Sequence, residues 1–139
     1  MFKSILIPVD VAVPEETQTL LAAATELTKN WDCTRHVVTV VPTVGMPIVS
    51  SYFDENFEVA SQKAATQELT KAVRASGIDA RTHVLNGRIY DAVITQAKES
   101  ETDLIIIGAQ QPDIKDYLLG SNAARIVRHA TQSVMVLRV

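Results

Sequence analysis

The chain has 139 residues, a length that predicts one domain with a buried core. Its net charge of -3 argues against binding to nucleic acid or to an anionic membrane through bulk positive charge, and its single cysteine excludes a disulfide framework. No apolar run resembles a secretory leader or approaches the ~20 residues that span a bilayer, so we expect a cytoplasmic protein.

The first part of the chain predicts a strand, a helix, a second strand and a loop. Residues 4–9 (SILIPV) are nearly all apolar, as in a strand that is buried on both faces. Pro14 and the two glutamates after it suit the start of a helix, which ends at Asn30. β-branched residues at 36–41 predict the second strand, and residues 42–52 (PTVGMPIVSSY) predict a long functional loop, a lid or a partner surface.

The rest of the chain continues the alternation of helix and strand. Further helices are predicted at 55–75, 90–98 and 122–129, and further strands at 80–85, 103–107 and 133–137. The 55–75 helix is expected to end at Ser76-Gly77 and to place toward the core Phe57, Ala60, Ala64, Leu69 and Val73. Strict alternation predicts a single-domain α/β fold with a five-stranded parallel sheet in the order 3-2-1-4-5 and helices on both faces.

In that order the first and fourth strands flank the point where the sheet changes direction. Open α/β sheets bind ligands there, at the carboxyl ends of the strands. Pro8 and Asp10 would then lie beside Gly108, Gly120 and Ser121. A glycine at a strand end and a Gly-Ser pair that opens a helix offer backbone N–H groups and the positive end of a helix dipole. Together they predict a phosphate site, to which Asn122 would also belong.

The other end of this crevice suits a nucleoside. The Asp10 carboxylate can accept a hydrogen bond from an exocyclic amine or a ribose hydroxyl, and backbone groups near Val40 can bind a base edge. Arg88, after the Asn86-Gly87 turn, can reach a phosphate. Spacing alone leaves a purely structural interpretation open as well. In that interpretation Asp10 is a turn former or helix N-cap, Val40 is a core residue and Arg88 is a solvated arginine. Gly108 then only ends a strand, and Gly120-Ser121 only caps a helix.

Residues that could carry out catalysis are scattered along the chain. His36, His83 and His129 lie in three different predicted elements without metal-ligand spacing, and Cys33 suits a small core position. We expect His36 and His83 to be partly buried structural residues, and Asp103 to begin its strand far from the ligand edge. The sequence contains no Walker motif and no nucleophile elbow, so turnover is expected to be slow or absent.

Five segments resemble the universal stress protein family, and they cover essentially the whole chain: KSILIPVD, TVVP, NGRIYDAVITQA, DLIIIGA and LLGSNAARIVRHATQSVMVLR. The last segment is similar to the F/G branch of the bacterial proteins. The resemblance implies a Rossmann-like fold of the adenine nucleotide alpha hydrolase-like type. It also implies ATP, ADP or AMP in the crevice, with or without Mg²⁺, and a homodimer or tetramer. The strand from Ser133 to Val139 would form that interface, and as a sheet edge it needs covering in any case.

By position, the resemblance implies that Asp10 and Val40 contact the adenine, that Pro8 lies near the ribose, and that the glycines and Ser121 hold ribose and phosphates. Crevice and resemblance together predict the nucleotide-binding residues Pro8, Val9, Asp10, Val40, Gly87, Arg88, Gly108, Gln110, Gln111, Gly120, Ser121 and Asn122. The family pattern Gly-x2-Gly-x9-Gly-Ser/Thr is altered here, because Gln111 replaces the second glycine and the following loop is one residue shorter.

Three functions follow from the sequence, in decreasing order of preference. The first is a nucleotide-binding stress-response protein in which nucleotide occupancy sets a conformation or a choice of partner. The second is a dimeric interaction module without a ligand. The third is a weak ATPase or a self-phosphorylating protein, with Ser121 as the acceptor.

Overall fold

The computed structural model describes residues 1–42, 55–109 and 117–139. Its strands form one parallel sheet in the order β3-β2-β1-β4-β5, which confirms the predicted topology. The strands are β1 (Ser4–Pro8), β2 (Thr34–Val41), β3 (Arg81–Asn86), β4 (Leu104–Ala109) and β5 (Ser133–Arg138). The helices are α1 (Pro14–Thr28), α3 (Glu55–Ser76), α4 (Ile89–Glu99) and α5 (Tyr117–His129).

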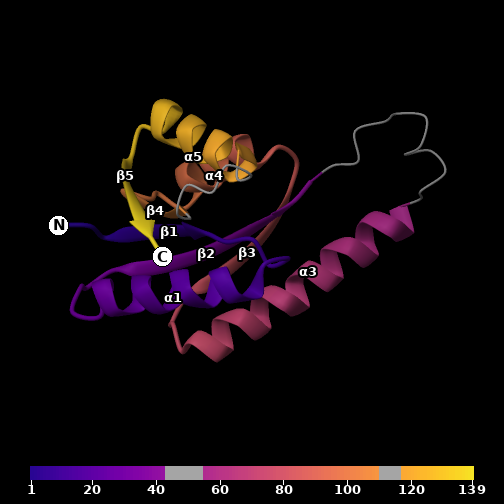
Figure 1. Ribbon diagram of the computed structural model, residues 1–139, viewed down its shortest axis with the longest axis horizontal. Helices are drawn as coiled ribbons and strands as arrows, with labels where there is room; N and C mark the ends of the chain where they lie inside the picture. The colour runs from indigo at the N-terminus through magenta and orange to yellow at the C-terminus, as the bar shows by residue number, and fades with distance from the viewer. Residues whose placement is uncertain (43–54, 110–116) are drawn as a thin grey trace.

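The helices lie on both faces of the sheet, α1 and α3 on one and α4 and α5 on the other (Figure 1). Side chains of β1 alternate between the two faces. Ile5 and Ile7 pack in the cluster beneath α1 and α3, whereas Leu6 packs in the cluster beneath α4 and α5. All three are fully buried, and burial of one such side chain contributes about 1.5–3 kcal/mol. A nearly continuous apolar run is therefore what a central, doubly covered strand requires.

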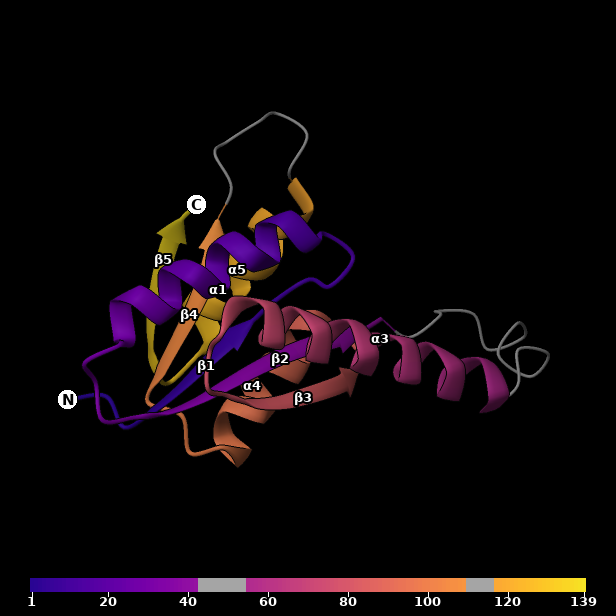
Figure 2. The same cartoon turned by 90° about the horizontal axis from the view of Figure 1, so that it is seen from below.

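Helix α3 extends past the ends of the strands that it packs against (Figure 2). Its C-terminal half carries the expected core residue Leu69, which is buried, and the helix stops at Gly77, whose φ of +72° favours glycine. Ala60 and Ala64, however, are exposed, and Ala65 is buried instead. The predicted core face was wrong for these two alanines because the N-terminal half of the helix has no strand beneath it.

Helix α5 begins at Tyr117, five residues before the predicted start. Gly120 and Ser121 therefore lie inside the helix, and the prediction that they open it was wrong. The spacing of Leu119, Ala123 and Ile126 continues the helical period across the glycine, whose cost of about 1 kcal/mol relative to alanine does not interrupt it. The surroundings of Gly120 and of the Ser121 side chain lie outside the described part of the chain. The same holds for Gln110, Gln111 and most of the predicted 42–52 loop.

Candidate functional site

The crevice at the switch point exists because β1 and β4 pair only at their amino ends. Their register runs from Ile5↔Leu104 to Leu6↔Ile105, whereas β1 stays paired with β2 as far as Pro8↔Val38. The N–H of Val9 donates to the Val38 carbonyl of β2 (2.8 Å), so an N–H at position 8 would face β4. Proline has none. Pro8 therefore ends the ladder on the β4 side.

A pocket of about 320 Å³ occupies this edge of the sheet, a volume within the range of small-molecule sites. Among the predicted site residues, it is lined by Pro8, Val9, Asp10, Val40, Gly108 and Asn122. Its walls also include apolar side chains from β2, β4, α4 and α5 that were not among the predicted site residues: Val38, Ile89, Val93, Ile107, Ala123 and Ile126. Their only sequence signal was core-like periodicity, which does not distinguish a pocket wall from a packed interior.

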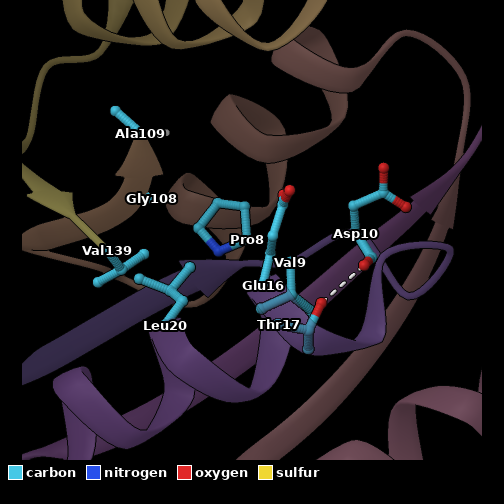
Figure 3. Close-up of a pocket in the computed structure, with 9 residues that line it drawn as sticks. All are labelled: Pro8, Val9, Asp10, Glu16, Thr17, Leu20, Gly108, Ala109 and Val139. Atoms are coloured by element: carbon cyan, nitrogen blue, oxygen red, sulfur yellow. Dashed lines mark hydrogen bonds between the residues drawn. The ribbon is translucent and has the colours of Figure 1, made fainter. Parts of the chain in front are cut away.

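Asp10 combines the two interpretations that the sequence left open. Its Oδ1 accepts a hydrogen bond from the Ala12 N–H at 2.9 Å, as in a turn former. Its backbone carbonyl accepts one from the Thr17 hydroxyl at 2.6 Å, which ties the turn to the start of α1 (Figure 3). The residue itself is exposed and lines the pocket. The turn therefore holds the carboxylate in place without enclosing it.

The backbone of Val9 is already engaged on the β2 side. Its carbonyl accepts a hydrogen bond from the Thr39 hydroxyl at 3.0 Å, and its N–H donates to β2. These two bonds fix the end of β1 at the pocket wall. Among the described lining residues, Asp10 carries the one charged side chain, so the pocket is mostly apolar with a carboxylate near its edge. Such a lining suits a flat apolar ring that carries a hydrogen-bond donor.

Gly108 lines the larger pocket, but a side chain at this position would point toward α1. A Cβ at this position would lie 3.2 Å from Leu20 Cδ2, which is closer than ordinary van der Waals contact. The glycine therefore allows α1 to pack closely on β4. A second, smaller pocket of about 60 Å³ adjoins it, where Gly108, Leu20 and Glu16 lie beside the C-terminal Val139 (Figure 3).

The remaining predicted residues lie at the rim or away from the crevice. Gly87 forms the turn after β3 with a φ of +120°, and its N–H donates to the Val41 carbonyl at 3.2 Å. Arg88 is exposed at the N-cap of α4, and neither residue lines the 320 Å³ pocket. At the opposite edge, the Asp103 carboxylate accepts backbone hydrogen bonds from Lys3 and Ser4, far from the ligand edge as expected.

The described residues contain no helix that is long and apolar enough to cross a membrane. Across the same ranges, no three His, Cys, Asp or Glu side chains converge in a way that could hold a metal ion. Cys33 is half-buried against the α1–α3 cluster, as a small core residue would be. His129 lies in the last turn of α5, where its ring contacts that of Tyr90.

Comparison with known proteins places this architecture in a family. The model of the universal stress protein family matches residues 1–138. Universal stress protein G of Salmonella typhimurium is 35% identical, over 99% of this chain and 100% of that protein. A universal stress protein from Archaeoglobus fulgidus in complex with dAMP has a similar structure, with a TM-score of 0.65, 19% identity and 96% of each chain covered. A universal stress protein in complex with cAMP has a TM-score of 0.63 and 19% identity, over 99% of this chain and 97% of that one.

Proposed function

The chain belongs to the universal stress protein family, and from this we propose that it binds an adenine nucleotide, ATP by preference, and acts in stress response as a nucleotide-dependent regulatory module. One observation carries the proposal, namely the mostly apolar 320 Å³ pocket at the β1–β4 switch point with Asp10 on its lining. The structurally similar proteins that were solved with dAMP and with cAMP support the choice of an adenine nucleotide.

The adenine would lie against the aliphatic wall. Val38 and Val40 of β2 and Ile107 of β4 offer flat apolar contact, and the Asp10 carboxylate is positioned to accept a hydrogen bond from the exocyclic amine or a ribose hydroxyl. The volume of the pocket suits a nucleoside better than a whole triphosphate, so the phosphates would extend out of it.

The phosphates would extend toward the N-terminal part of α5, where backbone N–H groups and the helix dipole favour negative charge. The helix begins at Tyr117, so its free N–H groups come before Gly120. Ser121 and Asn122 follow within the helix, and Gln110 and Gln111 precede it in the sequence. Arg88, exposed at the start of α4, would add a positive charge from the rim. Any Mg²⁺ would be held mainly by the phosphates themselves, as is usual for this ion in nucleotide sites.

Two adjacent alanines of α5 provide a matched test. Ala123 lines the pocket, whereas its neighbour Ala124 is exposed. Protein stripped of small molecules should release heat on titration with ATP, and Ala123→Phe should abolish that heat while Ala124→Phe leaves it unchanged. Mass spectrometry of molecules released from the purified protein would identify the resident nucleotide. Absence of heat at millimolar ATP, or full binding by Ala123→Phe, would disprove the proposal.

We also propose a homodimer through β5. This strand is an edge of the sheet, where Val136 is 43% exposed, and Val139, directly after the strand, is 39% exposed. An unpaired edge with exposed valines is a surface that a second copy could cover with two-fold symmetry. Sedimentation should therefore detect a dimer, and Val136→Lys should dissociate it. If the dimer persists while stripped protein binds no nucleotide, the ligand-free interaction module becomes the better description.

Two further expectations remain proposals. The cytoplasm is the proposed location because a chain with one cysteine suits a reducing compartment. Slow ATP hydrolysis, or phosphorylation of Ser121, would appear as labelled γ-phosphate in solution or on the protein.

A further inference from the structure

Two histidines face each other beneath α4, near the amino edge of the sheet and away from the proposed nucleotide pocket. His36 Nδ1 of β2 and His83 Nε2 of β3 are 2.8 Å apart, and the rings stack with their centroids separated by 5.1 Å. His36 is only 5% exposed. The sequence predicted two separate, partly buried residues, whereas the structure joins them in one hydrogen bond between neighbouring strands.

The register of the two strands brings the histidines together. His36 pairs with Arg81 and Val38 pairs with His83, so both imidazoles project from the same face and are diagonal neighbours. That face belongs to α4, because Val38 packs in the cluster beneath α4 and α5. An open hollow beside the pair is also lined by Gln96 and Glu99 of α4 and by Lys3, Arg81 and Glu101.

The pair can hold one bridging proton but not two. When both rings are neutral, one nitrogen donates its N–H and the facing nitrogen accepts it. One added proton leaves the hydrogen bond intact if the facing nitrogens keep a single hydrogen between them. When both rings are protonated, two N–H donors and two positive charges face each other at 2.8 Å, and the hydrogen bond is lost.

We propose that the His36–His83 pair is an acid-sensitive latch, which holds the edge strand β3 to β2 near neutral pH and releases it when both rings are protonated. Strand β3 is well suited to release. It has one strand neighbour, and its first two residues are exposed. Loss of the latch would therefore open β3 locally while the central strands remain buried.

Burial and the charges around the pair determine the direction in which the two histidine pKa values shift. Burial lowers the pKa of His36, and the neighbouring His83 and Arg81 lower it further. Burial and Arg81 likewise lower the pKa of His83, against an opposing effect of Glu99. Lys3 and Glu101 complete the charged lining of the hollow with one charge of each sign. The cationic contributions outweigh Glu99, so the folded state resists protonation of either ring.

The sign of the pH dependence follows from these lowered pKa values. In the unfolded chain the two histidines titrate near 6.5, and in the folded protein they titrate below that value. Below pH 6.5 the unfolded state therefore binds more protons than the folded state. The contribution of the pair to stability is complete above pH 6.5 and is lost as the pH falls toward the folded pKa values.

Hydrogen exchange of the β3 amides tests the latch in the intact protein. Protection factors, which correct for the intrinsic effect of pH on exchange, should fall at least about tenfold from pH 7.5 to 5.0 in Thr82, His83 and Val84. In His83→Gln the amide can donate to, or accept from, His36 without a second charge. Its protection should therefore change less than about threefold over the same range. The exposed His129 serves as the matched control, since His129→Gln should behave as the parent does.

An NMR titration of the imidazole nitrogens in the unmodified protein needs no variant. The two rings should titrate in two linked steps, both below pH 6.5. The proposal is overturned if His36 and His83 titrate independently near 6.5, if β3 keeps its protection at pH 5.0, or if His83→Gln loses protection as the parent protein does.

Discussion

Replacement of Asp10 by asparagine separates the two roles that the structure gives this residue. The asparagine side chain keeps an oxygen that can accept the Ala12 N–H, so the turn before α1 should persist. It loses the negative charge and presents an NH₂ group, which cannot accept a hydrogen bond from an adenine amine or a ribose hydroxyl. Asp10→Ala removes both functions and serves as the comparison.

The contacts of Asp10 determine how much nucleotide affinity and stability each substitution should remove. A hydrogen bond to a charged group contributes about 1.5–3 kcal/mol, and the exposed position of Asp10 places it near the lower limit. Since about 1.4 kcal/mol corresponds to a tenfold change in Kd, Asp10→Asn should weaken nucleotide binding about tenfold. Its free energy of unfolding should change by less than about 0.5 kcal/mol, whereas Asp10→Ala should lose about 1 kcal/mol with the turn.

Calorimetric titration with ATP and with adenosine, alongside urea denaturation of the same preparations, measures both quantities. Adenosine is informative because it lacks phosphates, so a change in its affinity reports on the nucleoside end alone. The reasoning is refuted if Asp10→Asn binds adenosine as tightly as the parent, because Asp10 would then be a turn former only.

Three further substitutions test the architecture of the site. Asp103→Ala should destabilise the fold by about 2 kcal/mol in urea unfolding, because it removes the acceptor of two backbone N–H groups at the start of β1, and Asp103→Asn should cost about half as much. Pro8→Ala supplies an N–H that faces β4, so nucleotide affinity measured by calorimetry should fall while the free energy of unfolding stays within about 1 kcal/mol of the parent. Gly108→Val should cost about 2 kcal/mol by collision with Leu20, and a Leu20→Ala background should recover part of that loss, as measured by urea unfolding of the double variant.

Sequence periodicity was enough to predict the sheet, because β1 and β4 are nearly continuous apolar runs and strand and helix patterns alternate along the whole chain. The order 3-2-1-4-5 is sufficient to predict that Pro8 and Asp10 lie beside Gly108, and all three residues line the larger pocket. Helix ends were harder to predict. Gly120-Ser121 has the composition of a helix start, yet the apolar period upstream carries α5 back to Tyr117.

Contacts that depend on register could not be predicted. His36 and His83 meet only because β2 and β3 pair with His36 opposite Arg81, and nothing in either strand alone specifies that alignment. Gly108 illustrates a second limit. Its position suggested close approach to an anion, but its missing side chain accommodates Leu20 of α1. A glycine in a sequence does not indicate whether it serves a positive φ, as at Gly77 and Gly87, or a close approach, nor which neighbour makes that approach.

The parallel sheet also places the two ends of the described chain at opposite ends of the strands (Figure 2). Val139 lines the small pocket beside Gly108, whereas Met1 is fully exposed at the amino edge. An affinity tag or fluorescent fusion added after Val139 would emerge beside the proposed nucleotide site and next to β5, where it could obstruct both ligand and partner. A tag placed before Met1 is therefore the appropriate choice for binding and assembly measurements.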